Sequence, residues 1–270
     1  MFDACLARWR LQPDGDPITT PGSDLLPVRT AEGAPAMLKR ARTPEERAGL
    51  ALMAWWDGDG AARVLAMSGA VLLMERATAA TDLLACAHRD AAGDDVASDI
   101  LCDVLARLHA PRTPAAPDLA SLDGWFVALR REAVRAGGVL ADCAGIADRL
   151  LAAPQEVVPL HGDCHHRNVL DFGARGWLAI DPKDRRGERA FDHAQLLCNP
   201  DLRHAADPAR FARQLARVAA RAGLDPTRLA QWAAARAALS AVWFMEDDDA
   251  AGVAHDLAIA RTALRHLSER

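Results

Sequence analysis

Lysine is almost missing from this 270-residue chain. Of its 32 basic residues only two, Lys39 and Lys183, are lysines, and the other thirty are arginines. We attribute the excess of arginine, together with the abundance of alanine, to coding bias in a GC-rich genome. Against that background, each lysine marks a position that calls for a compact ammonium charge.

An excess of positive charge, paired cysteines and long apolar runs are lacking as well. The net charge of −5 and the pI of about 6.0 argue against nucleic acid as the main partner. If the charge indicates anything about substrates, it favours cationic ones. The six scattered cysteines show no CxxC pair, so we interpret them as buried thiols of a cytoplasmic protein. No signal peptide and no apolar run of 18 residues is visible, so we expect no membrane association.

The first quarter of the chain is typical of a small antiparallel sheet that carries one helix. Two pairs of short apolar runs, each pair joined by a turn that contains glycine, predict two hairpins. Between them, Thr43, Pro44 and Glu46 predict a helix start with a capping box, and the helix is expected to stop at Asp57. The four predicted strands are residues 26–30, 36–40, 63–67 and 70–74.

After Ala77 the apolar residues follow a helical spacing. Asp-Pro pairs at 207–208 and 225–226 predict two helix starts, and Gly223 closes the helix between them. The sequence therefore predicts a second lobe, residues 77–270, that is mainly helical, beside a first lobe of residues 1–76. The other predicted helices cover residues 94–109, 119–129, 139–151 and 253–267.

A hairpin interrupts the helical half. A predicted strand at 157–160 leads into the polar loop His161–Asn168, and short strands at 169–172 and 177–180 lead to Asp181. Phosphoryl transfer needs a carboxylate near the nucleophile, oxygen ligands for Mg²⁺ and a cation on the phosphates. Asp163, Asn168 and Asp181 can surround one such centre, and Lys39 can reach the phosphates from the sheet.

These residues carry a resemblance. The pattern H-G-D-x-H-x-x-N followed by I-D-P, with a single strand lysine far upstream, resembles the aminoglycoside phosphotransferases, a kinase-like family. The chain looks most similar to the streptomycin 6-kinase and hydroxyurea phosphotransferase branch, from about Pro21 to the last helix. The matching segments are W-W-D-G-D-G-A-A-R at 55–63, L-M-E-R-A at 73–77, H-G-D-C-H-H at 161–166 and G-W-L-A-I-D-P-K at 176–183.

The resemblance implies an α+β, protein-kinase-like bilobal fold and an enzyme that uses ATP and Mg²⁺. The first lobe would bind the nucleotide, and the second would hold the catalytic loop and the acceptor site. Asp163 would be the catalytic base, and Asn168 and Asp181 would bind the metal. The implied nucleotide-binding residues are Lys39 on the phosphates, Ser23 in the segment that replaces a glycine-rich loop, Glu46 as a partner of Lys39, and Glu75 and Ala77 at the adenine hinge.

Several roles stay open. Either Glu45 or Glu46 can pair with Lys39, and Lys183 either contacts a phosphate or is solvated. Asp192 either anchors the catalytic loop or caps the helix that it opens. His161 is expected to shape the loop through hydrogen bonds to the backbone.

The resemblance makes streptomycin, phosphorylated at its 6-hydroxyl, the expected acceptor of a monomeric enzyme. Because streptomycin carries two guanidinium groups, we hypothesise that Glu246 and Asp247 contact it, although such an acidic run is usually a solvated helix end. Alternative acceptors are hydroxyurea, choline-like alcohols and sugars. Two other classes are a metal-dependent hydrolase that uses the histidines of the 161–168 loop, and a kinase-like binding module.

Overall fold

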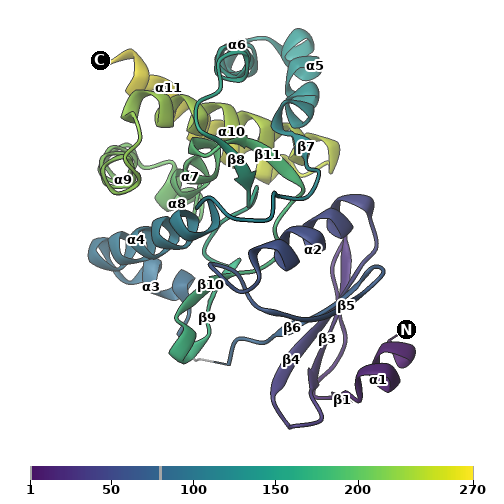
Figure 1. Ribbon diagram of the computed structural model, residues 1–270. Coiled ribbons are helices and arrows are strands. Elements are labelled where there is room, and N and C mark those ends of the chain that lie inside the picture. The colour runs from purple at the N-terminus through teal and green to yellow at the C-terminus, as the bar shows by residue number, and fades with distance from the viewer. Residues whose placement is uncertain (1, 79–80, 270) are drawn as a thin grey trace.

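The computed structural model describes residues 2–78 and 81–269, and it consists of an antiparallel sheet followed by a mainly helical part (Figure 1). Helix α2 lies between the sheet and the helical part. This arrangement confirms the expected α+β, kinase-like bilobal fold. We propose that the two lobes meet near residues 76–77, directly after the last strand of the sheet.

The sheet follows the order β1-β3-β4-β6-β5, with β2 also paired to β3, and all its pairs are antiparallel. Alternate residues of β4 face opposite sides: Ala36 and Leu38 pack with Phe2, which directly precedes helix α1 (Asp3–Trp9), whereas Ala41 packs in the core that contains α2. Lys39 therefore lies on the α2 side of the sheet. The strands are β1 (Gln12–Pro13), β2 (Ile18–Thr19), β3 (Ser23–Arg29), β4 (Pro35–Ala41), β5 (Val64–Ser68) and β6 (Val71–Glu75).

Helix α2 (Pro44–Trp56) begins and ends where the sequence predicts. The side chain of Thr43 accepts a hydrogen bond from the N–H of Glu46 at 3.3 Å, and Asp57 ends the helix in a left-handed conformation. Gly49 lets the helix approach the hairpin closely, because a Cβ there would lie 2.3 Å from the carbonyl oxygen of Pro182. The missing side chain thus brings α2 against the segment that follows Asp181.

The helical part packs around α10, whose buried face includes Trp232 and Leu239. No helix in the described residues is long and apolar enough to cross a membrane. The helices are α3 (Leu83–Arg89), α4 (Ala91–Leu108), α5 (Phe126–Ala136), α6 (Gly138–Ala152), α7 (Ala190–Leu197), α8 (Leu202–Ala205), α9 (Pro208–Ala222), α10 (Pro226–Glu246) and α11 (Ala250–Ser268), with the 3₁₀ turns η1 (Leu122–Trp125) and η2 (Gly173–Arg175).

Two small sheets are set into this helical part. The antiparallel pair β9 (Val169–Asp171) and β10 (Trp177–Ala179) forms the hairpin that the sequence predicts. The other sheet places β11 (Arg185–Glu188) between β8 (Val157–Leu160) and β7 (Ala120–Ser121). The loop 161–168 therefore connects one small sheet to the other.

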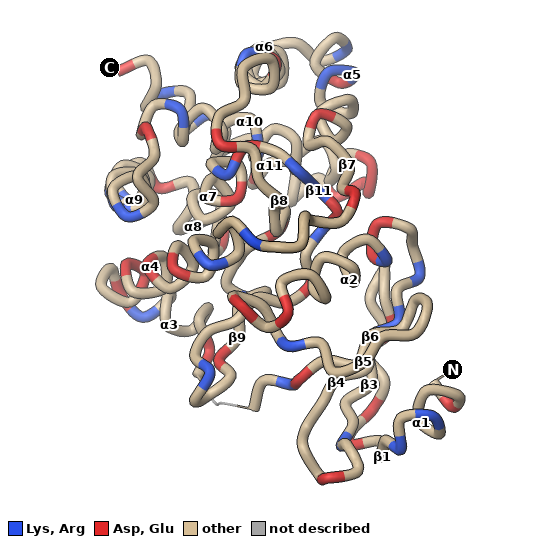
Figure 2. The backbone as a smooth tube through the Cα atoms, viewed as in Figure 1, with Lys and Arg blue, Asp and Glu red and all other residues tan. Residues whose placement is uncertain are grey.

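A row of ion pairs joins α4 to α9; Figure 2 marks the acidic residues of α4 in red and the basic residues of α9 in blue. Arg210 forms two hydrogen bonds with Asp94 in the interior, at 2.9 and 2.8 Å. Toward the surface, arginines spaced four residues apart on α9 meet aspartates spaced four apart on α4, because residues four apart share one helix face. These outer pairs are Arg213 with Asp95, Arg217 with Asp99 and Arg221 with Asp103.

Three secondary-structure expectations were wrong. A short helix, α1 (Asp3–Trp9), precedes the sheet, where the sequence analysis predicted strands and turns. Residues 119–129 do not form one helix: β7 and η1 come first, and α5 begins at Phe126 because the chain must first pair with β11. The capping box at α2 is only half formed, since the Glu46 side chain is bonded to Lys39 and Ser23 instead.

Candidate functional site

The loop 161–168 is held by one buried carboxylate. Asp192 in α7 accepts hydrogen bonds from the N–H groups of His161 and Gly162, both at 2.8 Å, and lies 2.8 Å from Nε2 of His109. Its side chain is buried, and burial alone would raise its pKa, but the bond from His109 and the loop N–H groups lower the pKa of Asp192 instead. Because α7 is capped at Arg189, Asp192 is the loop anchor and not a helix cap.

His161 shapes the loop through both ring nitrogens. Its Nε2 lies 2.9 Å from the carbonyl oxygen of Ile180, and its Nδ1 lies 3.2 Å from the N–H of Asp163. A carbonyl can only accept and an N–H can only donate, so the ring carries one proton, on Nε2. Burial lowers the pKa of His161, which keeps this neutral form. The expectation that His161 shapes the loop is confirmed, and neither nitrogen is left to bind a metal.

Asp163 stands at the tip of this loop. Its Oδ1 accepts a hydrogen bond from Gln195 at 3.1 Å, and its Oδ2 lies 3.3 Å from Nδ2 of Asn168 and 3.6 Å from Nε2 of His165. Nη2 of Arg236 lies 4.0 Å from Oδ1. Burial would raise the pKa of Asp163, but His165 and Arg236 outweigh it and hold the pKa below its ordinary value. The carboxylate is therefore ionised and can accept a proton.

Both lysines of the chain meet in one cluster. Lys39 Nζ lies 2.6 Å from Oε2 of Glu46 and pairs with Oδ1 of Asp181. Lys183 Nζ lies 3.1 Å from Oε1 of Glu46 and 3.5 Å from Oδ2 of Asp181. Two ammonium groups thus alternate with two carboxylates, a ring that we call the lysine cluster. Burial would raise the pKa of Asp181, but the two lysines lower it.

The structure resolves which glutamate faces Lys39. Glu46 does, and Ser23 Oγ donates a hydrogen bond of 2.8 Å to the same carboxylate. Glu45 instead lines a neighbouring cavity. Burial would raise the pKa of Glu46, and the hydrogen bond and charge of Lys39 lower it, so the pair is ionised. Lys183 is not simply solvated, because it belongs to the same cluster.

Asn168 and Asp181 line one cavity of about 160 Å³ together with Lys39 and Ser23. The N–H of Ile180 donates to the carbonyl oxygen of Asn168 at 2.8 Å, which fixes the two segments side by side. Asp181 itself has a φ of 61°, a left-handed conformation that is uncommon for a residue with a side chain. The other walls, from the sheet and α2, are largely apolar.

The expected hinge residues Glu75 and Ala77 do not line this cavity, whereas Met74 does. The Glu75 side chain accepts a hydrogen bond from the N–H of Arg63 at 2.6 Å and pairs with Arg175. Glu75 therefore ties the sheet to the β9–β10 turn. An adenine contact at this point would have to use the backbone.

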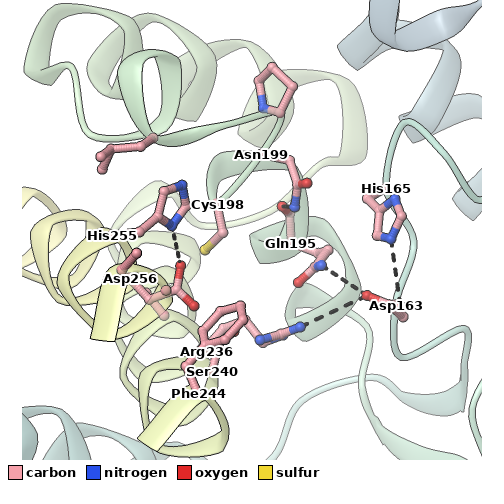
Figure 3. Close-up of a pocket in the computed structure, with 15 residues that line it drawn as sticks. Asp163, His165, Gln195, Cys198, Asn199, Arg236, Ser240, Phe244, His255 and Asp256 are labelled. Carbon is pink, nitrogen blue, oxygen red and sulfur yellow. Dashed lines mark hydrogen bonds and ion pairs between the residues drawn. The ribbon is translucent and has the colours of Figure 1, made fainter. Parts of the chain in front are cut away.

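A wider cavity, about 570 Å³, has Asp163 among its lining residues (Figure 3). We call it the α10–α11 cavity, because Arg236 of α10 and Asp256 of α11 reach into it. Asp256 is buried and lies 2.6 Å from Nδ1 of His255. The cavity is lined by Asp163, His165, Gln195, Cys198, Asn199, Pro200, Leu202, Arg236, Ala237, Ser240, Phe244, Ala251, Gly252, His255 and Asp256.

The structure does not bring Glu246 and Asp247 to this cavity. Both lie at the C-terminal end of α10, and Oε1 of Glu246 is 2.5 Å from Nη2 of Arg131. Besides Asp163, the cavity contains a second acidic side chain, Asp256, which we did not predict from the sequence. Its only signal, shared with Arg236, is a charge on the buried face of an otherwise apolar helix.

A family model described as "Aminoglycoside/hydroxyurea antibiotic resistance kinase" matches residues 8–248 of the chain. A streptomycin 3''-kinase of Klebsiella pneumoniae is 52% identical over 247 residues, which cover 90% of this chain and 91% of the relative. A streptomycin 6-kinase of Streptomyces glaucescens is 32% identical over 269 residues, with 93% of this chain and 84% of the relative covered.

Among solved structures, a thermostable mutant of an aminoglycoside phosphotransferase, crystallised with ADP and hygromycin B, superposes with a TM-score of 0.64. Its sequence is 12% identical, and the match covers 97% of each chain. At that identity the likeness shows the shared fold.

Proposed function

This chain belongs to the aminoglycoside/hydroxyurea antibiotic resistance kinases and is a small-molecule kinase, and we propose that it transfers the γ-phosphate of ATP to a hydroxyl group of streptomycin. The observation that carries the proposal is the position of Asp163. Its ionised carboxylate lines the α10–α11 cavity, while its neighbour Asn168 lines the cavity of about 160 Å³ together with Lys39 and Asp181 of the lysine cluster. A hydroxyl in the first cavity and a phosphate in the second would meet at Asp163.

In the proposed reaction, Asp163 orients the acceptor hydroxyl and accepts its proton. The hydroxyl oxygen forms a bond to the γ-phosphorus while the bond from that phosphorus to the bridging oxygen of ADP breaks. Gln195 and Asn168 hold the carboxylate in place, because each donates to one of its two oxygens. Lys39 lies on the phosphate side and offsets the negative charge there.

The donor set at Asn168 and Asp181 fits Mg²⁺. The side-chain NH₂ of Asn168 donates hydrogen bonds to Asp163, so its side-chain oxygen is left for a cation. Asp181 is held ionised by Lys39 and Lys183. One carboxylate and one amide oxygen, completed by phosphate oxygens and water, suit this small, hard ion. When bound, the ion would neutralise phosphate charge.

We further propose the remaining nucleotide contacts as the resemblance implies them. Glu46 and Ser23 would position Lys39, and the backbone at Glu75–Ala77 would meet the adenine. The lysine cluster supports the first part, since Ser23, Glu46 and Lys39 are linked by bonds of 2.8 and 2.6 Å.

For the acceptor, we propose that Asp256 binds a guanidinium group of streptomycin. A buried carboxylate that faces an open cavity can pair with a guanidinium through two parallel hydrogen bonds. Asp256 is 5% exposed and has His255 as its partner. We do not extend this proposal to Glu246 and Asp247, because neither lines the cavity.

The phosphorylated position is proposed as the 3''-hydroxyl. The sequence analysis expected the 6-hydroxyl, but the relative at 52% identity is a 3''-kinase, whereas the 6-kinase is 32% identical. The 6-hydroxyl is the second candidate.

ADP release with Mg-ATP would test the proposal, with streptomycin, hydroxyurea, choline and a simple sugar as acceptors. We expect release only with streptomycin, and NMR of the product would show which hydroxyl carries the phosphate. Asp163→Asn should lower kcat/KM by about 10³-fold, and Asp171→Asn, in the strand that follows the loop, should change it little. ADP release with another acceptor alone would contradict streptomycin as the substrate. Full activity of Asp163→Asn would contradict the role of Asp163 as the base.

A further inference from the structure

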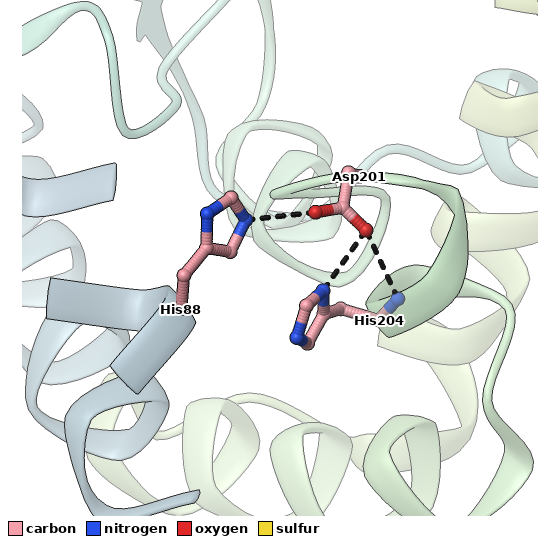
Figure 4. Close-up of side chains that lie close together, drawn as sticks. All are labelled: His88, Asp201 and His204. Carbon is pink, nitrogen blue, oxygen red and sulfur yellow. Dashed lines mark hydrogen bonds and ion pairs between the residues drawn. The ribbon is translucent and has the colours of Figure 1, made fainter. Parts of the chain in front are cut away.

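Three potential metal ligands converge outside the site described above (Figure 4). His88 lies in the last turn of α3, Asp201 precedes α8 and His204 lies within α8. Nε2 of His88 is 2.7 Å from Oδ2 of Asp201, and Nδ1 of His204 is 2.9 Å from Oδ1. The two imidazole rings stack with centroids 5.0 Å apart. Residues more than 110 positions apart in the sequence are thus gathered around one carboxylate.

We propose that His88, Asp201 and His204 form a binding site for a divalent transition-metal ion, with Zn²⁺ as the ion that fits best. One ligand atom from each residue lies within 4.8 Å of the other two. In a tetrahedral zinc site with bonds of about 2.0–2.1 Å, ligand atoms stand a little over 3 Å apart. The contacts of 2.7 and 2.9 Å are made to different oxygens of Asp201, so an ion between the imidazoles would take both oxygens of this carboxylate or replace one of the two contacts.

The ligand types decide the class of ion. Two imidazole nitrogens and one carboxylate oxygen suit Zn²⁺ and its neighbours among the transition metals, whereas Mg²⁺ and Ca²⁺ prefer oxygen ligands alone. The side chains of His88 and Asp201 are 38% and 41% exposed, so solvent can supply the ion and a water for the fourth position. The site is thus chemically distinct from the Mg²⁺ site proposed at Asn168 and Asp181.

Helix capping accounts for only part of the cluster. Asp201 caps α8 with Oδ1, which accepts from the N–H of His204 at 3.2 Å. Oδ2 is not needed for the cap, and it is the atom that faces His88. Three arginines, Arg89, Arg210 and Arg213, line the same cavity as His88 and His204, and two of them, Arg210 and Arg213, are paired with Asp94.

The position of the site suggests what the ion would do. Asn199, Pro200 and Leu202, directly beside Asp201, line the α10–α11 cavity. An ion bound to His88 and Asp201 would fix this wall to α3. Fixing this wall would lower the KM for streptomycin, an effect that rests on the proposed function. Binding of the ion does not depend on the proposed function.

Calorimetric titration of the full chain with Zn²⁺ in excess Mg²⁺, after treatment with a chelator, would test the site. We expect one Zn²⁺ per chain and a higher Tm with Zn²⁺, because the ion binds only the folded state. His88→Asn and His204→Asn keep a side chain that can hydrogen-bond Asp201, and each should weaken Zn²⁺ binding by at least about ten-fold. His266→Asn, which removes an imidazole from α11, is the matched control.

Unchanged Zn²⁺ affinity in both His88→Asn and His204→Asn, or no Zn²⁺ binding by the wild-type chain, would overturn the proposal. Equal weakening in His266→Asn would also overturn it, because the effect would then not belong to this cluster. Zn²⁺ binding without any change in the KM for streptomycin would leave the metal site standing and remove only its link to the acceptor.

Discussion

Two of the cavities at the site differ in how their charges are arranged. On one side, the lysine cluster neutralises itself, with Lys39 and Lys183 each shared between Glu46 and Asp181. On the other side, the α10–α11 cavity is more than three times as large and contains Asp256 and Arg236, which belong to different helices. Phosphate chemistry is the same for every acceptor and needs a fixed set of charges, whereas an acceptor site needs room and a few selective groups.

This comparison predicts that variants on the phosphate side lose catalysis and that variants on the acceptor side lose selectivity. Of the two lysine variants, Lys39→Met should have the larger effect, lowering kcat/KM by about 10²–10³-fold, because in the proposed reaction it removes a cation that offsets developing negative charge. Lys183→Met, in the same cluster but partly exposed, should cost less, about ten-fold. Steady-state kinetics of both variants with ATP and streptomycin would measure this, and the reverse order would make Lys183 the main phosphate ligand.

Asp256→Asn should raise the KM for streptomycin by about ten-fold, because a hydrogen bond between charged groups is lost, and should leave the KM for ATP unchanged. Glu45→Gln is the matched control, since Glu45 lines the neighbouring cavity of about 450 Å³ that also contains Asp163. If Glu45→Gln raises the KM for streptomycin and Asp256→Asn does not, the acceptor binds in that neighbouring cavity instead.

His165→Asn should change the pH dependence more than the rate. His165 helps to hold the pKa of Asp163 below its ordinary value, so its removal raises that pKa, and the base becomes protonated at a higher pH. The acidic limb of the profile of kcat/KM against pH should therefore move to higher pH, with less than about a three-fold change above neutrality. An unmoved limb would show that His165 does not act on Asp163.

The smallest effect is expected at the end of α10. The double change Glu246→Gln and Asp247→Asn should alter the KM for streptomycin by less than about two-fold, since neither residue lines the α10–α11 cavity and exposed pairs such as Glu246 with Arg131 contribute little. A rise of ten-fold or more in the KM for streptomycin would show that Glu246 or Asp247 belongs to the acceptor site.

Local sequence signals sufficed for much of the fold. Thr43, Pro44 and Asp57 define the limits of α2, and Asp207 and Asp225 mark two helix starts with hydrogen bonds of 2.7 and 2.6 Å to N–H groups three residues later. These caps and turns depend on residues close together in the chain, so a single sequence contains the whole signal. Helix α1 and the pairing of β11 lacked such a signal.

The sequence by itself determined which residues are candidates for the proposed phosphate side, because the loop 161–168 and the segment after β10 hold their polar residues at fixed short spacings, and because the chain contains only two lysines. Only the tertiary structure decided that Glu46 and not Glu45 pairs with Lys39, that Asp192 bonds to the loop, and that Asp256 and not Glu246 faces the cavity. Each of these choices depends on which face of a helix packs against a distant segment, and a change of one residue in helix register, about 100°, reverses it.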